Sequence, residues 1–193
     1  MLEKGRSCTV EPIRLKKDIR AIKKYLHDNK RDLAIFTLGI NSALRASDLL
    51  RLRLSQLKNI RPGQGFEIRE KKTGKIRMVT VNRNSYHAVQ AYLKIRNESP
   101  PDAPFFLSQK GVWQGLTVAS LHRKIKHWTR NINLPGNYGT HSLRKTFGYH
   151  QRVSYRVDIP TLMVCFNHST QSQTLRYLGI NDEEIHSVFM NEI

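Results

Sequence analysis

The sequence is poor in cysteine and in long apolar runs, and each shortage excludes a class of protein. Only two of its 193 residues are cysteine, too few for a disulfide scaffold or a cysteine-based zinc site, so a reducing compartment is expected. The longest apolar stretch, Leu33 to Ile40, is broken by Thr37 and Gly39 and falls short of the ~18 residues of a membrane span. With no signal peptide and no internal repeat visible, we expect one soluble, cytoplasmic domain.

Acidic residues are also scarce, and this leaves a large positive charge. The chain has 33 Lys and Arg against 15 Asp and Glu, a formal net charge of +18. No acid lies between Asp102 and Asp158, a segment that holds many of the cations. Such a charge favours a polyanionic partner, DNA or RNA, which we expect residues 103–157 to face.

Most of the chain has the apolar spacing of helices. Leu15, Ile19, Ile22 and Leu26 are spaced four, three and four residues apart, which predicts an amphipathic helix. After Asp32, the residues Leu33, Ala34, Ile35, Phe36 and Leu38 are apolar nearly all round and predict a buried helix that ends near Gly39. Further helices are predicted after a Ser42 or Ser47 cap with Arg45 at the start, after Asn84 or Ser85, after Thr117, from Ser142 to Phe147, from Pro160 to Phe166, around Tyr177, and after a capping box at Asn181 to Glu184.

A small sheet interrupts the helices. Phe66 to Glu70 and Ile76 to Val81 predict two strands joined by a tight turn at Thr73-Gly74, and Phe105 to Leu107 is a short strand at most. The fold class is therefore mainly α with a small antiparallel β-sheet (α+β). We expect an N-terminal arm over residues 1–14, a main domain over 15–180, and a helical tail over 181–193 with Ile185, Val188 and Phe189 on one side.

Candidate chemical groups concentrate between Gly139 and Gly179, where His141, Arg144, His168 and Tyr177 fall. Taken singly they prove little: a lone histidine is more often a surface or packing residue, and Tyr177 could fill a core. Arg45 could simply pair with Asp48 three residues later. Five other histidines are assigned to that ordinary class: His87, His122, His127, His150 and His186.

The joint order of these groups is more specific. Arg45 followed by Asp48, a Lys-Thr-Gly-Lys hairpin, His141-Ser-Leu-Arg144, and His168 nine residues before Tyr177 resembles the tyrosine recombinase (phage integrase) family over about residues 15–180. The resemblance implies a mostly helical catalytic domain that cuts and rejoins double-stranded DNA as a site-specific recombinase. It also implies a covalent 3′-phosphotyrosine, no metal or ATP, a homotetramer acting on two DNA sites, and a nucleoid-associated location in the cytoplasm.

The resemblance assigns each residue a role. Arg45 and Arg144 would hold the scissile phosphate, Lys72 would protonate the leaving 5′ oxygen, and Tyr177 would be the nucleophile. His141 and His168 would be the two histidines of the site, with Asp48 orienting structure near the first arginine. The DNA contacts expected from charge are Lys71, Lys75, Arg123, Lys124, Lys126, Lys145, Arg152 and Arg156.

The chemistry of phosphoryl transfer independently calls for these groups. Two planar guanidiniums can each donate two hydrogen bonds to the charge that develops on phosphate oxygens. A tyrosine with an ordinary pKa of about 10 needs a base or adjacent cations to attack at neutral pH, and His141 fits that role. A lysine among cations can protonate the leaving oxygen, and Lys71 and Lys75 remain alternatives to Lys72.

The sequence departs from the family in its N-terminal part and at Asn167. Fourteen residues are too few for the DNA-clamping domain that usually precedes the catalytic one, which leaves either a catalytic-domain-only member or a fragment. Asn167 stands where the family often has glycine before the histidine, and asparagine tolerates the left-handed conformation. The rival functions are a catalytically silent DNA-binding regulator and a type IB topoisomerase-like enzyme; a metal-dependent nuclease has little support because no carboxylate cluster is visible.

Overall fold

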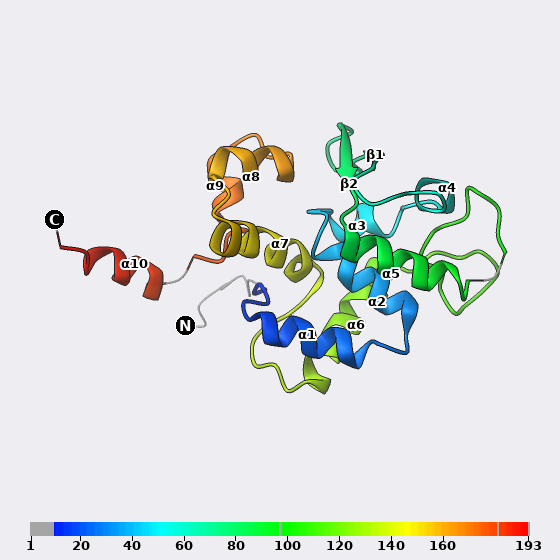
Figure 1. Cartoon of the computed structure of the whole chain (residues 1–193), viewed down its shortest axis with the longest axis horizontal. Coiled ribbons are helices and arrows are strands. Elements are labelled where there is room, and N and C mark those ends of the chain that lie inside the picture. The colour runs from blue at the N-terminus through cyan, green and yellow to red at the C-terminus, as the bar shows by residue number, and fades with distance from the viewer. Residues whose placement is uncertain (1–9, 97, 181, 193) are drawn as a thin grey trace, which may run out of the picture.

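The computed structural model describes residues 10–96, 98–180 and 182–192, and within these ranges the chain is mainly helical with one two-stranded sheet (Figure 1). This confirms the predicted α+β class. In chain order the elements are α1 (Lys16–Tyr25), α2 (Lys30–Gly39), α3 (Ala46–Leu49), α4 (Leu54–Leu57), β1 (Gly65–Arg69), β2 (Ile76–Thr80), α5 (Arg83–Leu93), α6 (Val118–Asn131), α7 (Thr140–Tyr155), α8 (Ile159–Phe166), α9 (Gln171–Leu175) and α10 (Asp182–Phe189).

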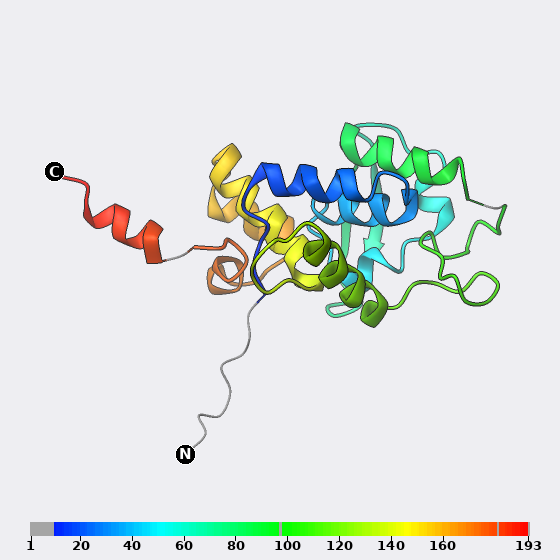
Figure 2. The same cartoon turned by 90° about the horizontal axis from the view of Figure 1, so that it is seen from below.

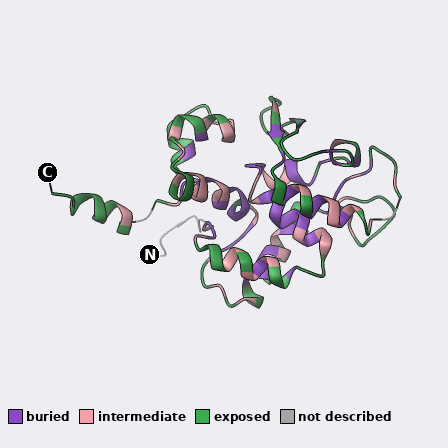
Figure 3. Cartoon of the chain, viewed as in Figure 1, coloured by how far each residue is buried: buried purple, intermediate pink, exposed green. Residues whose placement is uncertain are grey.

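Helix α2 lies at the centre of the main core, as its nearly uniform apolar sequence predicts. Its N-terminus is capped by Asn29, whose side chain accepts a hydrogen bond from the backbone N–H of Asp32 at 3.1 Å. Phe36 is 1 % exposed and meets Trp128 of α6 edge to face. Figure 3 shows the buried residues gathered around α2 and its neighbours. The other elements of the main core therefore pack around α2.

The β1–β2 hairpin forms where it was predicted, with Phe66 opposite Val79 in an antiparallel register. Both of these side chains are buried. Its turn includes Gly74 in the left-handed region at φ +67°, which glycine adopts at little cost. The three lysines of the turn, Lys71, Lys72 and Lys75, are all exposed, so the hairpin presents a cationic tip on a buried base.

A second, smaller core joins α7 to α8 and to the chain that follows α9. Leu162, Phe166 and Leu178 are fully buried there together with Ala43 from the loop before α3. Helix α8 begins with a side-chain cap from Asp158 and ends with Asn167 in the left-handed conformation. The prediction that Asn167 can take the place of glycine at this helix end is therefore confirmed.

Several predicted element boundaries are wrong. Helix α7 continues past Phe147 to Tyr155, since Gly148 is accommodated inside it rather than ending it. Asn82, not Asn84 or Ser85, caps α5, and α3 has no side-chain cap from either serine because Arg45 occupies the N-cap position. Helix α9 ends at Leu175, which leaves Tyr177 in the following turn and not in a helix. Residues 105–107 agree with the expectation of a short strand at most, since Leu107 forms only an isolated bridge with Gly115.

The described part of the N-terminal arm is not loose. Ile13 is 1 % exposed, and its backbone N–H donates to the hydroxyl of Thr146 on α7 at 2.8 Å. Glu11 also donates its backbone N–H to the carbonyl of Asn137. Residues 10–14 are thus part of the folded domain, because an apolar residue and two backbone donors find partners on its surface.

Helix α10 extends away from the body of the molecule in both views (Figures 1 and 2). Its apolar residues Ile185, Val188 and Phe189 are exposed to 49 %, 64 % and 82 %, so they do not pack on their own domain. An ion pair of 2.8 Å between Arg152 on α7 and Glu184 connects α10 to the body. Asn181, the start of the predicted capping box, lies outside the described residues.

No helix in the described ranges combines the length and the apolar character needed to cross a membrane.

Candidate active site

Arg45 reaches the site from the start of α3. Its Nη1 atom forms an ion pair with Oε2 of Glu70 at 2.6 Å, and not with Asp48 as the local alternative had it. Asp48 instead accepts a hydrogen bond from the backbone N–H of Lys71 at 2.9 Å. Asp48 therefore holds the lysine-bearing turn, while the guanidinium of Arg45 is held by a different carboxylate.

Arg144 lies in the first turns of α7 and is 1 % exposed. It donates through Nη1 to the carbonyl of Ala43, and through Nη2 to the carbonyl of Phe166 at 2.7 Å. Its Nε is buried without a partner in the described part of the chain. Burial first, and then the charge of Arg45, lower the pKa of Arg144 to about 10, so the guanidinium remains charged at neutral pH.

His168 contacts that guanidinium, with Nε2 3.1 Å from Nη2 of Arg144. A guanidinium only donates, so Nε2 must accept, and the ring proton lies on Nδ1, which donates to the hydroxyl of Thr174 at 3.0 Å. Burial and the positive charges of Arg144 and Arg45 lower the pKa of His168 to about 4. At neutral pH this histidine is uncharged and orients Arg144.

The hydroxyl of Tyr177 lies 3.3 Å from Nδ1 of His141. The tyrosine ring packs against His168 and Phe166, with ring centroids 5.3 and 5.5 Å away, and the guanidinium carbon of Arg144 is 5.4 Å from its centroid. The turn after α9 thus aims the hydroxyl at the N-terminal turn of α7, where His141 stands.

His141 is a surface residue whose ring nitrogen faces this hydroxyl. Partial burial of the ring lowers its pKa, and the positive charges of Arg144, Lys145, Arg45 and Lys72 lower it further. A neutral imidazole at pH 7 can accept the tyrosine proton. Sequence reasoning placed His141 and Tyr177 together, and the structure brings them within reach of a hydrogen bond.

Lys72 contributes positive charge from the exposed turn of the hairpin. Its ammonium group has no hydrogen bond or ion pair to any residue that the structure describes, and the side chains of Lys71 and Lys75 are likewise exposed. The geometry therefore leaves Lys71 and Lys75 beside Lys72 as alternatives for the proton donor.

Sequence reasoning missed Glu70, a carboxylate that is 1 % exposed. Besides Arg45, its Oε2 accepts from Thr73 Oγ1 at 2.8 Å and from Asn167 Nδ2 at 3.0 Å. The signal was present: Phe66 and Ile68 are the inward residues of β1, and the same alternation carried two residues further puts Glu70 on the buried side. A buried carboxylate requires partners, and here the site supplies them.

Arg77 was also missed. From β2 its Nη2 donates to the carbonyl of Ser42 at 2.9 Å, its Nη1 to the carbonyl of Cys165, and its Nε lies 3.8 Å from Glu70. Arg77 thus ties the hairpin to α8 and to the loop before α3, and brings a third guanidinium next to those of Arg45 and Arg144.

The side chains predicted to contact DNA differ in their exposure and in whether they are paired with a carboxylate. Arg123 and Lys126 on α6 and Arg156 at the end of α7 are exposed. Lys145 is partly buried, and burial lowers its pKa. Lys124 and Arg152 are bound to carboxylates, to Asp32 at 2.9 Å and to Glu184 at 2.8 Å. Each of these two would have to share or leave its acid in order to bind phosphate.

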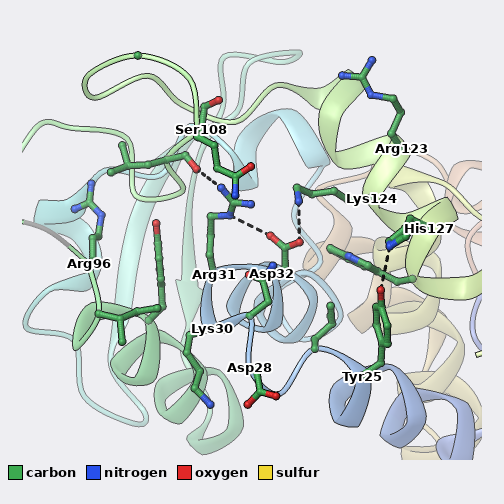
Figure 4. A pocket seen from close by; sticks show the side chains of 18 of the residues that line it. Tyr25, Asp28, Lys30, Arg31, Asp32, Arg96, Ser108, Arg123, Lys124 and His127 are labelled. Carbon is green, nitrogen blue, oxygen red and sulfur yellow. Dashed lines mark hydrogen bonds and ion pairs between the residues drawn. The ribbon is translucent and has the colours of Figure 1, made fainter. Parts of the chain in front are cut away.

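A pocket of about 1120 Å³ lies elsewhere, between the α1–α2 loop, α5, α6 and the loop after residue 107 (Figure 4). Figure 4 shows Asp32 near its centre, paired with Arg31 and Lys124. None of the residues proposed for catalysis lines this pocket. In the described part of the chain no group of three or more His, Cys, Asp or Glu side chains is placed to hold a metal ion.

A tyrosine hydroxyl beside a neutral imidazole, with the buried guanidinium of Arg144 and the partly buried one of Arg45 close by, has the groups that nucleophilic attack on a phosphodiester requires. On a mainly helical, strongly basic domain, these groups are those expected of a DNA strand-transferase. The chain belongs to the phage integrase family, whose profile matches residues 15–184, and it is a tyrosine recombinase of the integrase type.

Individual relatives agree with that assignment. The chain is 33% identical over 183 residues to the probable integrase/recombinase YoeC of Bacillus subtilis, covering 93% of this chain and 95% of that protein. It is 30% identical to tyrosine recombinase XerC of Caldanaerobacter subterraneus, covering 81% of this chain and 43% of XerC. The chain thus spans almost all of YoeC and less than half of this XerC.

Solved structures support the fold. XerA recombinase superposes with a TM-score of 0.76 at 18% identity, covering 93% of this chain and 65% of XerA. XerH bound to its palindromic difH substrate superposes with a TM-score of 0.73 at 17% identity, covering 99% of this chain and 56% of XerH.

Proposed function

We propose that this chain cuts and rejoins duplex DNA through a covalent 3′-phosphotyrosine on Tyr177, using protein groups alone, without metal or ATP. The observation that carries the proposal is the 3.3 Å approach of the Tyr177 hydroxyl to the imidazole of His141 next to Arg144. DNA as the substrate follows from the family and from the charge of +18.

In the cleavage step His141 takes the phenolic proton, and the Tyr177 oxygen forms a bond to the scissile phosphorus. The bond from phosphorus to the 5′ oxygen breaks, and that oxygen takes a proton from Lys72, or from Lys71 or Lys75. Arg45 and Arg144 stabilise the non-bridging oxygens. Rejoining reverses each transfer, with a 5′ hydroxyl attacking the phosphotyrosine, so no high-energy cofactor is consumed.

Arg45 and Arg144 differ in how many of their N–H donors are left to bind phosphate. In the described part of the chain the Nε and Nη2 atoms of Arg45 have no protein partner, so they are available. Arg144 has three of its five donor hydrogens engaged. It is 1 % exposed, and the ring of Tyr177, in the turn after α9, lies over its guanidinium. We therefore propose that DNA binding shifts this turn before cleavage.

The assembly proposed is a homotetramer on two DNA sites, in a nucleoid-associated location. Helix α10 supports it, because Ile185, Val188 and Phe189 are exposed on an element that leaves its own domain. Such an apolar face is stabilised when a neighbouring subunit covers it.

Covalent capture tests the proposal. The purified chain is incubated with duplexes that carry random sequence and a nick in one strand, and protein-linked DNA is recovered under denaturing conditions and sequenced. We expect an adduct at the 3′ end of the cut strand, formed equally well in EDTA, on duplexes that share a sequence. A silent regulator would bind and leave no adduct, and a topoisomerase-like enzyme would relax supercoiled plasmid and give adducts without a shared sequence.

A further inference from the structure

Glu70 is a single buried carboxylate at which three separate parts of the site meet. It follows β1 directly, and its Oε2 atom contacts Arg45 at the start of α3, Thr73 in the hairpin turn, and Asn167 at the end of α8. Each partner adjoins a residue of the proposed chemistry: Thr73 follows Lys72, and Asn167 precedes His168.

The charge of Glu70 matters as much as its contacts. Arg45, Arg77 and Arg144 bring three positive charges together, and burial lowers the pKa of both Arg77 and Arg144, with Arg45 adding to the effect. Burial alone would raise the pKa of Glu70, but hydrogen bonds from Thr73, Arg45 and Asn167 outweigh it and hold the pKa below its usual value. The carboxylate is therefore ionised and offsets repulsion among the guanidiniums.

The contact also fixes the direction of a long side chain. An arginine at a helix start has many accessible rotamers, and ordering them costs conformational entropy. With Nη1 held by Glu70 at 2.6 Å, Arg45 is ordered before DNA arrives and keeps other N–H groups for phosphate. Preorganised donors of this kind stabilise a transition state more than donors that must reorganise during the reaction.

We propose that Glu70 is a positioning residue for cleavage, which holds Arg45 in the phosphate-binding orientation and joins it to the Lys72 turn and to the helix end before His168. This inference rests on the proposed strand-cleavage function. Glu70 touches no reacting atom in it and acts through Arg45, the turn and Asn167.

The chain offers a matched control. Asp32 is also a buried carboxylate, 2 % exposed, and is also held by two cations, Arg31 and Lys124, but it lies in the pocket away from the site. Glu70→Gln and Asp32→Asn each replace a paired buried carboxylate with an amide of the same size. A loss of stability is therefore expected from both, and a loss specific to cleavage from Glu70→Gln only.

The test is single-turnover adduct formation on the captured site at saturating DNA, corrected for the folded fraction. Glu70→Gln should lower the rate at least tenfold with a DNA Kd within twofold of wild type, and Glu70→Asp should recover part of the rate. Asp32→Asn should stay within twofold of wild type. When Glu70→Gln is added to Arg45→Ala, the cleavage rate should fall by less than a further twofold, because the two residues act as a unit.

Several results would overturn the inference. A Glu70→Gln protein that cleaves at the wild-type rate, or an equal loss for Asp32→Asn, leaves Glu70 with a structural role only. A full tenfold further loss on the Arg45→Ala background means that Glu70 does not act through Arg45. If wild type itself forms no adduct, the proposed function fails as well, and that result is distinct from an active wild type with an unaffected variant.

A second measurement does not depend on cleavage. Phenylglyoxal modifies free arginine side chains, and peptide mass spectrometry reports the rate at each arginine. Glu70→Gln should raise the modification rate of Arg45 severalfold and leave that of Arg31 unchanged, whereas an unchanged rate at Arg45 would show that Glu70 does not hold it.

Discussion

Gly148→Ala is the substitution that most directly tests how the fold places the nucleophile. Gly148 lies inside α7, and a Cβ atom built there would be 2.8 Å from Cζ of Phe166 and 2.9 Å from the backbone carbonyl oxygen of Tyr177. Ordinary van der Waals contact begins at 3.4 Å. Because one of the two atoms is backbone, a rotamer change cannot relieve the contact, and the Tyr177 turn must move away by about 0.5 Å.

Two effects oppose each other in the free energy of unfolding. Alanine is favoured over glycine inside a helix by about 1 kcal/mol, whereas overpacking costs about 1–3 kcal/mol. The net loss of stability is therefore about 0–2 kcal/mol. Cleavage should be more sensitive than stability, because a misplacement of about 1 Å can cost about a hundredfold in rate. Here the turn that carries the nucleophile moves by about half that distance. We expect adduct formation to slow about tenfold or more.

The assay is single-turnover adduct formation at saturating DNA, together with urea unfolding to give the folded fraction. Gly65→Ala is the matched control, because its Cβ would meet chiefly the flexible side chain of the exposed Met78. We expect that control to cleave at the wild-type rate. A Gly148→Ala protein that is folded and cleaves as fast as wild type would refute the reasoning that this close packing sets the position of Tyr177.

The remaining predictions concern three other parts of the site. Arg144→Lys keeps a charge but loses the forked donors, so adduct formation should slow about a hundredfold, ~2.7 kcal/mol by comparison with loss of one oxyanion donor, without disappearing; an unchanged rate would contradict the role of Arg144. Because the pKa of His141 is lowered and the base must be neutral, the rate should fall on the acid side only below about pH 6.5, the ordinary histidine value, and a pH–rate profile that already falls above pH 7 would contradict this. Removal of residues 182–193 should reduce cooperative binding of two DNA sites, measured by gel shift, more than binding of a single site. Equal losses would argue against coverage of α10 by a neighbouring subunit.

The sequence predicts the parts of the structure that depend on local spacing and on a motif order. The buried helix α2, the hairpin and the left-handed Asn167 follow from apolar periodicity and turn chemistry, and the structure contains all three. The approach of His141 to Tyr177 across 36 positions follows instead from the order of the motif. Neither the local pattern nor the motif order specifies distances between atoms. The hydrogen bonds that Arg144 donates to protein groups could therefore not be predicted.

What could not be predicted depends on contacts between distant segments. Arg45 has an acid three residues away, yet it pairs with Glu70, because the residues that follow β1 lie next to the start of α3. The predicted helix stops at Phe147, whereas α7 continues through Gly148, against which Phe166 and the turn at Tyr177 pack. In each case a long-range contact overrides a local preference.

Tyr177 is the residue that we propose becomes linked to DNA. The direct measurement is mass spectrometry of the peptide that carries DNA after trapping with a nicked duplex, for the wild-type protein and for Tyr177→Phe. Loss of the hydroxyl keeps the ring that packs against Phe166 and His168, so fold and DNA affinity should be nearly unchanged while the adduct disappears. We predict a 3′-linked nucleotide on Tyr177; an adduct on Tyr149, Tyr155 or a serine, or one that persists in Tyr177→Phe, would contradict the account.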